Sequence, residues 1–312
     1  MKFNSKILVT GASGMLGHSL LNQLNLNNVE VHGISSKNLD LRNLEKTQDY
    51  FQKYQPKIVI HSAAIVGGIN ANMKNPVKFI QENLLMQLSV FNACHKANVQ
   101  KLIFLGSSCM YPKGCRQPMK EEYLLTGHLE PTNSAYAMAK LAGLEQLKAF
   151  QSEFGHRWFS IISTNLYGPH DNFSVESSHV IPALISKFHS AVKNDQPEVK
   201  IMGTGNAKRE FMYVDDLSNA INFLLNNYEN VEPINVGFGS DITIKELVEI
   251  VRVSLGFRGK VIYDSSAPEG QVQKLLDSSK ISAMGWTPKV SLTSGIQQTV
   301  SWFKKEIAGR NG

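Results

Sequence analysis

The stretch KILVTGASGMLG, residues Lys6–Gly17, decides the fold. Its unalternating apolar run predicts a buried β-strand, and the amphipathic residues that follow to about Leu26 predict a helix. Between them, Gly11, Gly14 and Gly17 form a G-x-x-G-x-x-G turn. Glycine lets the backbone turn sharply and approach a pyrophosphate, while the helix N-terminus offers its unpaired N–H groups. The stretch therefore predicts a dinucleotide site; the other interpretation is an ordinary strand–helix turn.

The same alternation of strand and helix continues along the first half of the chain. Further strands are expected at Val29–Ile34, Lys57–His61, Lys101–Leu105 and Arg157–Ser163, and helices at Pro76–Ala97 and Tyr136–Phe154. Buried strands separated by helices indicate a parallel sheet, because right-handed crossovers place helices on both of its faces. The predicted fold class is therefore α/β, a Rossmann-type doubly wound parallel sheet.

After about Gly168 the pattern changes. A polar stretch is followed by a helix at Val180–Lys193, and another helix begins near Thr243, which can cap it with Glu246. Shorter strands are expected at Val199–Met202 and Pro233–Val236. We therefore expect a cofactor-binding Rossmann domain over residues 1–168, with a returning segment near 212–240, and a smaller C-terminal α/β substrate lobe over residues 169–211 and 241–312.

Composition narrows the class of protein. The chain has 312 residues, of which 42% are hydrophobic and 19% charged, so a packed core is expected. The net charge of +6 comes without a dense Lys/Arg block, and we expect no nucleic-acid partner. No apolar run approaches the roughly 20 residues that span a bilayer, and Met1–Lys6 lacks a signal-peptide pattern. The three cysteines fit neither a zinc site nor a disulfide framework, so a reducing cytoplasm is expected and no metal.

The end of the second strand bears on the choice of cofactor. An NAD site usually has an acidic residue there for the ribose 2′-hydroxyl. This chain has Ser35, Ser36 and Lys37, which suit a 2′-phosphate and favour NADP(H), although Lys37 also fits a solvated surface lysine. Asp40 follows and is expected at the adenine or, less readily, the ribose.

Small residues follow the third strand as well. Ala63 and Ala64 let a cofactor lie close, and packing alone also explains them. The residues expected to contact the cofactor along these turns are Gly11, Ser13, Gly14, Met15, Leu16, Gly17, Ser36, Lys37, Asp40, Leu41, Ala63, Ala64, Leu105, Gly106 and Ser108.

The expected chemical centre combines a strand end with a helix. Ser107 follows the strand at Lys101–Leu105, and Tyr136 and Lys140 lie one helical turn apart on one face. A phenol is a poor acid at neutral pH, and a neighbouring lysine cation stabilises its phenolate and lowers its pKa. With a serine hydroxyl on the same oxygen, such a group protonates a carbonyl during hydride transfer. Y-x-x-x-K alone occurs by chance; the upstream serine and glycine turn make hydride transfer the favoured interpretation.

Two more residues suit proton transfer at carbon. Cys109 lies two positions after Ser107, and would point to the same side of an extended chain. His179 precedes the helix at Val180. A thiol and an imidazole on opposite faces of a ketose can remove and return protons next to its carbonyl. The alternatives are a buried apolar cysteine and a surface or helix-start histidine.

Eight segments together resemble one known family, the GDP-L-fucose synthases of the extended short-chain dehydrogenase/reductases. The resemblance covers essentially the whole chain. The segments are VGGINAN (66–72), FLGSSCMYP (104–112), EPTNSAYAMAK (130–140), TNLYGPHDNF (164–173), SHVIPALISKFH (178–189), REFMYVDD (209–216), INVGFGSDITIKEL (234–247) and KLLD (274–277).

The resemblance implies an NADPH-dependent 3,5-epimerase and 4-reductase that converts GDP-4-keto-6-deoxy-mannose to GDP-L-fucose. Ser107, Tyr136 and Lys140 would reduce the 4-keto group. Cys109 would be the base and His179 the acid of epimerisation at C3 and C5.

The resemblance also implies contacts for both ligands. The residues implied are Asn165 and Leu166 at the nicotinamide end of the cofactor, and Asn83, Lys187, Met202, Arg209 and Asp277 at the GDP-sugar. Cations such as Lys187 and Arg209 suit a diphosphate, which Arg can bind with two hydrogen bonds. The chain departs from the family at Met202, where a tryptophan is frequent, and at Ser13, where an arginine is common.

Other functions remain beside this one. The alternative is a GDP-4-keto-6-deoxy-heptose C4-reductase, with partial or no epimerase activity, in surface polysaccharide synthesis. A 4,6-dehydratase is disfavoured because Cys109-Met110 stands where Asp-Glu is usual, and a cofactor-sensing protein because Tyr136 and Lys140 are both retained. The family further implies a homodimer that pairs the helices at Pro76–Ala97 and Tyr136–Phe154.

Overall fold

A six-stranded parallel sheet forms the core of the molecule in a computed structural model, which describes residues 6–25, 30–174, 177–266 and 270–310. The strand order is β2-β1-β3-β4-β5-β9, and all neighbouring strands are parallel. The strands are β1 (Ile7–Thr10), β2 (Val31–Ile34), β3 (Ile58–His61), β4 (Lys101–Ser107), β5 (Phe159–Ser163) and β9 (Ile234–Val236). The predicted Rossmann-type sheet is therefore confirmed; Val29 and Leu26, at the edges of a predicted strand and helix, lie outside the described residues.

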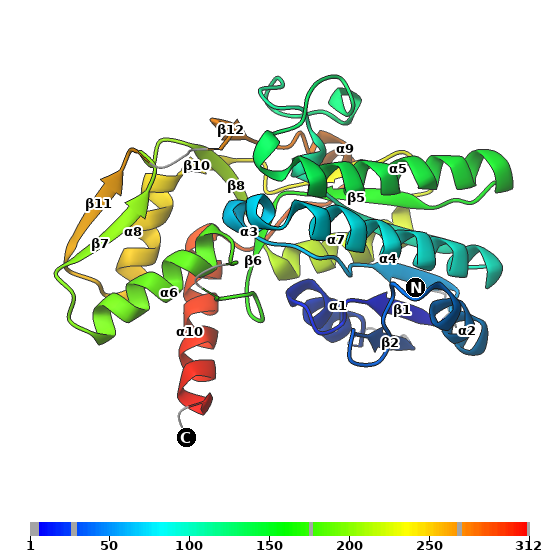
Figure 1. The fold of residues 1–312 in the computed structure, drawn as a ribbon, viewed down its shortest axis with the longest axis horizontal. Coiled ribbons are helices and arrows are strands. Elements are labelled where there is room, and N and C mark those ends of the chain that lie inside the picture. Colours follow the sequence, from blue (N-terminus) through cyan, green and yellow to red (C-terminus); the bar gives the residue numbers. More distant parts are fainter. Residues whose placement is uncertain (1–5, 26–29, 175–176, 267–269, 311–312) are drawn as a thin grey trace.

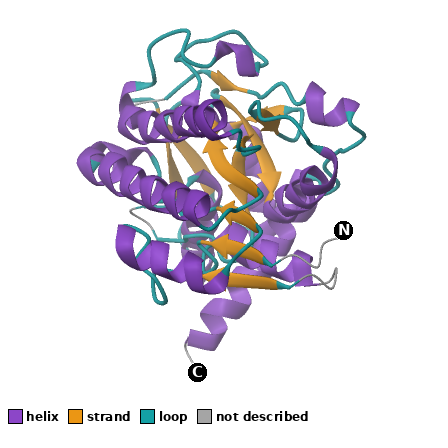
Figure 2. Cartoon of the chain, turned by 90° about the vertical axis from the view of Figure 1, so that its right-hand side faces the viewer, coloured by secondary structure: helices purple, strands orange, loops and turns teal. Residues whose placement is uncertain are grey.

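Helices cover both faces of this sheet, as Figure 2 shows. On β1, Ile7 and Val9 pack on one side against α1 (Met15–Asn25) and α7 (Val214–Asn227). Leu8 points to the other side, where α2 (Leu44–Tyr54), α4 (Pro76–Lys96) and α5 (Ser134–Phe154) complete a second cluster. Because both faces are buried, the strands are apolar without alternation.

A second group of elements lies beside the sheet, at the left of Figure 1. It contains a small mixed sheet of β6 (Asn165–Tyr167), β8 (Lys208–Tyr213), β10 (Asp241–Thr243) and β12 (Gln273–Lys274), and a parallel pair of β7 (Glu198–Met202) and β11 (Lys260–Asp264). An apolar cluster joins them to α6 (Val180–Lys193), α8 (Ile244–Leu255) and α10 (Leu292–Arg310).

The predicted helix at Thr243 is confirmed together with its cap. The Oγ1 of Thr243 accepts from the Glu246 N–H at 3.2 Å, and the Glu246 carboxylate accepts from the Thr243 N–H at 2.7 Å. α8 accordingly begins at Ile244 and ends before Gly256, whose φ of 75° is left-handed.

Short helices occupy the connections between these elements. They are α3 (Ile69–Lys74), α9 (Ser279–Ala283) and the 3₁₀ turns η1 (Ser108–Met110), η2 (Glu121–Tyr123) and η3 (Pro131–Asn133). Over the described part of the chain, no helix has the length and apolar character needed to cross a bilayer. The order of the sheet reverses between β1 and β3, and open α/β sheets bind ligands beyond the carboxyl ends of strands at such a point.

Candidate active site

The glycine turn after β1 is shaped by close packing. Gly11 has φ +73°, and a β-carbon there would lie 2.8 Å from the backbone of Ala63. A β-carbon on Gly17 would collide with the Gly11 carbonyl oxygen. α1 begins at Met15, so the N–H groups of its first turn have no partner within the helix. The glycines thus bring a helix N-terminus to the edge of the sheet, which is the arrangement that binds a pyrophosphate.

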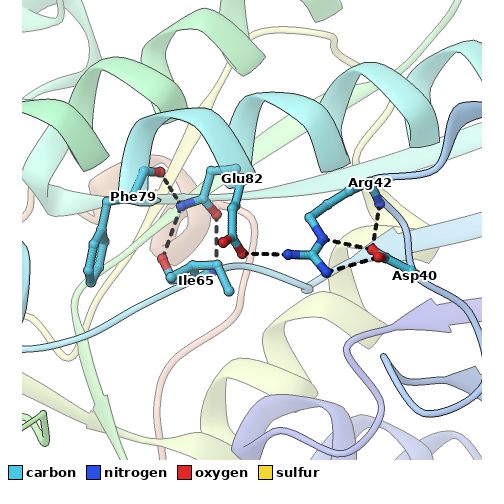
Figure 3. Close-up of polar contacts among 6 residues, drawn as sticks. Asp40, Arg42, Ile65, Phe79 and Glu82 are labelled. Atoms are coloured by element: carbon cyan, nitrogen blue, oxygen red, sulfur yellow. Dashed lines mark hydrogen bonds and ion pairs between the residues drawn. The ribbon is translucent and has the colours of Figure 1, made fainter. Parts of the chain in front are cut away.

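The loop after β2 contains the residues predicted to select the cofactor. Ser36 and Lys37 are exposed there. Asp40 is paired with Arg42 through Nε at 2.8 Å and Nη2 at 2.9 Å, and these hydrogen bonds lower the pKa of Asp40. Arg42 also reaches Glu82 of α4 at 3.1 Å, as Figure 3 shows. Both oxygens of Asp40 are therefore occupied by the protein itself.

Asn83 of α4 is hydrogen-bonded to the loop that follows β3. Its side chain accepts from the Ile65 N–H at 3.0 Å and donates to the carbonyls of Ile65 and Phe79, at 3.0 and 2.7 Å (Figure 3). The residue is only 1% exposed. In this position its amide fixes the loop that carries Ala63 and Ala64.

Several other predicted cofactor residues belong to the core. Leu41, Leu105 and Ser108 are buried, and Leu16 and Leu166 pack against the sheet. The exposed members of the glycine turn are Ser13 and Gly14.

Ser107, Tyr136 and Lys140 come together at the end of β4. Ser107 is hydrogen-bonded to Tyr136. Burial raises the pKa of the Tyr136 phenol, and this hydrogen bond acts in the opposite direction. Lys140 donates to the Leu105 carbonyl at 2.7 Å, and burial lowers its pKa to about 7. Its Nζ lies 5.9 Å from the centre of the Tyr136 ring. In this geometry burial raises the pKa of Tyr136, whereas the sequence predicted that the lysine would lower it.

Cys109 is placed by a turn rather than by a strand. The chain enters η1 directly after Ser107, so the extended geometry expected from the sequence is wrong. The turn still brings Cys109 close enough to Tyr136 to raise its pKa. The Cys109 sulfur accepts from Asn133 Nδ2 at 3.1 Å and from Lys274 Nζ at 3.6 Å.

His179 is the residue before α6, at a contact between the two groups of elements. The Gly68 N–H donates to the Ser177 carbonyl at 3.1 Å, and a β-carbon on Gly68 would lie 2.6 Å from the Ser178 oxygen. His179 is exposed, yet its surroundings lower its pKa by desolvation. An accessible imidazole enclosed by protein on its other sides is typical of a cleft.

The predicted sugar-nucleotide residues lie on α6 and the small strands. Lys187 Nζ donates to the Lys200 carbonyl at 2.7 Å, and Arg209 Nη1 to the Lys208 carbonyl at 2.7 Å. Met202, at the end of β7, is 57% exposed.

Two of the residues predicted to contact a ligand have side chains that are hydrogen-bonded within the protein. Asn165 Nδ2 donates to the Glu210 carbonyl at 2.9 Å. The Asp277 carboxylate accepts from the Ser279 N–H at 3.0 Å, at the start of α9.

Buried polar atoms without partners flank these residues. Asn133 Oδ1, Ser178 Oγ and both polar atoms of the Gln271 amide have no hydrogen bond among the described residues. Such atoms are rare in folded proteins, and a water molecule or a bound ligand can supply the missing partner. No sequence pattern pointed to Gln271, and Lys274 lies in the KLLD segment, where no role was predicted for it. Within the described ranges, no group of three or more His, Cys, Asp or Glu side chains is arranged to hold a metal.

Comparison with known proteins agrees with this geometry. Residues 7–237 match the NAD dependent epimerase/dehydratase family. GDP-L-fucose synthase 1 of Arabidopsis thaliana is 44% identical over 313 residues, covering 98% of this chain and 95% of that protein. The crystal structure of a GDP-6-OMe-4-keto-L-xylo-heptose reductase from C. jejuni matches with TM-score 0.91 and 30% identity, over 98% of this chain and 99% of that one. A GDP-L-fucose synthetase from Naegleria fowleri bound to NADP matches with TM-score 0.90 and 29% identity, over 99% and 96%. The chain therefore belongs to the NAD dependent epimerase/dehydratase family, with the GDP-L-fucose synthases among its relatives.

Proposed function

We propose that this protein is an NADPH-dependent epimerase and reductase that converts GDP-4-keto-6-deoxy-mannose to GDP-L-fucose. The observation that carries the proposal is the placement of the Cys109 thiol beside the Ser107–Tyr136 pair. A reductase needs only the phenol and the lysine, whereas a thiol beside them adds a base for carbon acids. The relatives named as GDP-L-fucose synthases supply the substrate class.

The chain's own residues fit NADP(H). The N-terminus of α1 and the exposed Ser13 and Gly14 suit the pyrophosphate, and Ser36 and Lys37 suit the 2′-phosphate. Asp40 is an acidic residue that could accept from the ribose 2′-hydroxyl of NAD, but its carboxylate is already paired with Arg42. When bound, NADPH supplies the hydride for C4. The remaining proposed contacts are Gly11, Met15, Leu16, Gly17, Leu41, Ala63, Ala64, Leu105, Gly106, Ser108, Asn165 and Leu166.

During reduction, Tyr136 gives its proton to the 4-keto oxygen as that oxygen becomes a hydroxyl. Ser107 hydrogen-bonds to the same oxygen and keeps it next to the phenol. The cation of Lys140, on the same face of α5, stabilises the phenolate that remains.

During epimerisation, Cys109 takes the proton from C3 or C5, both of which lie next to the 4-keto carbon. The electron pair moves onto the 4-keto oxygen, where Ser107 and Tyr136 donate hydrogen bonds. His179 then returns a proton to the opposite face of the carbon.

The second group of elements binds the sugar nucleotide in this scheme. We assign it to residues 169–211 and 241–312, with the cofactor on residues 1–168 and the segment near 212–240. Lys187 and Arg209 suit the diphosphate because they provide cations and several donors. Asn83, Met202 and Asp277 are further proposed contacts.

We propose a homodimer paired through α4 and α5. These helices leave apolar side chains exposed on neighbouring surfaces: Val77 at 62%, Leu85 at 46%, Leu88 at 48% and Met138 at 48%. A second copy of the chain would cover both helices through one two-fold axis. Light scattering should report a dimer, and Leu85→Glu with Leu88→Glu should give a folded monomer. Val253→Glu, on the exposed face of α8, is the control and should leave the dimer intact.

We place the reaction in the cytoplasm. Cys94, Cys109 and Cys115 are free thiols in the described structure, and the proposed reaction needs Cys109 reduced. A reducing compartment maintains that state.

A second function has its own support. The heptose reductase of C. jejuni has nearly the same fold over the same length. Met202 replaces a frequent tryptophan at an exposed strand end, which changes the shape available to the sugar. The alternative is therefore C4 reduction of a GDP-4-keto-6-deoxy-heptose with partial or no epimerisation.

The decisive experiment is incubation with GDP-4-keto-6-deoxy-mannose in D₂O, with and without NADPH, followed by NMR. The bifunctional enzyme should incorporate deuterium at C3 and C5 and form GDP-L-fucose only with NADPH. Cys109→Ser should lose the deuterium uptake but still oxidise GDP-L-fucose with NADP⁺ in reverse. Reduction without deuterium uptake, or turnover only with a heptose substrate, would establish the second function instead.

A further inference from the structure

Two nitrogen donors converge on the sulfur of Cys109. Asn133 Nδ2 lies 3.1 Å from it and Lys274 Nζ 3.6 Å from it. A neutral thiol is a weak acceptor, whereas a thiolate binds N–H donors strongly, above all cationic ones. We propose that Asn133 and Lys274 are positioning residues that hold Cys109 as a thiolate.

The fold brings Lys274 to this place over a long sequence separation. β12 pairs in parallel with β8, and Lys274 lies opposite Arg209. Because Lys274 is partly buried, its charge is less screened than a surface charge. The same cation also acts on Cys115, where it favours the ionised form while burial raises the pKa.

Asn133 is the second donor to the sulfur. It ends η3, where its N–H donates to the Glu130 carbonyl at 3.2 Å. Its Oδ1 is buried and has no partner in the described residues, so Nδ2 is the atom of this amide that is bonded. The titratable groups facing the sulfur are Lys274 from β12 and Tyr136 from α5.

The inference deepens the proposed function and rests on it for its chemical meaning. A thiolate takes the C3 or C5 proton directly: the S–H bond forms, the C–H bond breaks, and the electron pair moves to the 4-keto oxygen. Lys274 then faces a neutral thiol, which becomes a thiolate again when it releases the abstracted proton to solvent. His179, having given its proton to the opposite face of the carbon, takes up another from solvent.

Iodoacetamide alkylation of the ligand-free protein tests the inference without any substrate. Peptide mass spectrometry separates Cys109 from Cys115 and from the buried Cys94. Loss of a positive charge within about 4 Å of the sulfur lowers the thiolate population by roughly tenfold. A thiolate of higher pKa is a better nucleophile, which offsets part of this loss in the alkylation rate. We expect Lys274→Met to slow alkylation of Cys109 about threefold at neutral pH and to move its rate profile to higher pH.

Three further variants sharpen the result. Lys274→Arg should restore the profile, and Asn133→Asp should slow alkylation further because it puts a carboxylate beside the sulfur. Lys208→Met removes the exposed cation opposite the neighbouring Gln273 and should change nothing at Cys109. An unchanged Cys109 profile in both Lys274→Met and Asn133→Asp would overturn the inference. The proposed function fails separately, if the wild-type protein exchanges no deuterium in the D₂O experiment.

Discussion

Tyr136 is the residue on which both halves of the proposed reaction depend, since it is hydrogen-bonded to Ser107 and lies close to Cys109. Phenylalanine keeps the ring and removes the proton that the 4-keto oxygen receives. We expect Tyr136→Phe to lower kcat of reduction by about 100-fold or more, the usual range for a general acid. NADPH absorbance measures the rate, and Tyr123→Phe on η2 is the matched control. A Tyr136→Phe enzyme with the activity of the control would refute the proposed reduction chemistry.

Gln271 is the second residue with a direct test. Its amide is buried and unpaired within the described residues, which costs folding free energy that a ligand can recover. Leucine has a similar shape without polar atoms. We expect Gln271→Leu to raise the free energy of unfolding by about 1 kcal/mol, measured by denaturant titration, and to raise KM for the GDP-sugar. Exposed Gln297→Leu should alter neither. Lower stability of Gln271→Leu would contradict this assignment.

The sequence predicted the site residues that carry a local pattern. Tyr136 and Lys140 share a helical face, and Ser107 ends a strand, so spacing alone brought them together. Asn133 and Lys274 have no such pattern, because they meet Cys109 only through the pairing of β12 with β8 and the turn of η3. The extended geometry considered for Cys109 does not occur for a related reason: strand alternation stops where η1 begins.

The strand–turn–helix element built around Gly11 has its own test. A β-carbon on Gly17 would meet the Gly11 oxygen and lie 2.6 Å from Ala12 Cα, so the backbone of α1 has to move. A β-carbon on Gly14 has only the Gly11 oxygen near it, at 3.3 Å. We expect Gly17→Ala to cost about 2 kcal/mol of stability or more and Gly14→Ala less than about 1 kcal/mol, by urea unfolding. Equal losses would show that packing of α1 against the turn does not explain the motif.

Elements differ in how much of them was predictable. The strands of the parallel sheet and the helices α1, α4, α5, α6 and α8 were predicted to within a few residues because their patterns extend over whole elements. No range was predicted for α2, α7, α10 or β8. β6, β10 and β12 have two or three residues each, too few to show a period. They exist because β8 provides edges on which they pair, a long-range effect that no local pattern reveals.

At the scale of the whole molecule, the segment after β6 joins the parallel sheet to the second group of elements. His170 stacks on His18 of α1 at 3.9 Å between ring centres and lies 4.8 Å from Trp302 of α10. Asp171 comes next, with Oδ1 accepting from the Asn172 N–H at 2.7 Å and Oδ2 buried without a partner among the described residues. An acidic group at this junction links the stability of the assembled molecule to pH.

Burial raises the pKa of Asp171 from 3.8 to about 7. The folded protein therefore holds this proton more tightly than the unfolded chain, and its contribution to stability is complete below about pH 4 and lost as the pH rises through 7. Asn at this position keeps the Oδ1 acceptor and cannot ionise. The difference in unfolding free energy between wild type and Asp171→Asn should shift in favour of the variant from pH 5 to 8, by at most about 1.4 kcal/mol per pH unit. Chemical denaturation across this range measures it, with exposed Asp195→Asn as control. Both proteins contain the same histidines, so the contribution of histidine titration to the unfolding free energy cancels in the difference. A difference that stays constant with pH would show that Asp171 ionises as readily in the folded protein as in the unfolded chain.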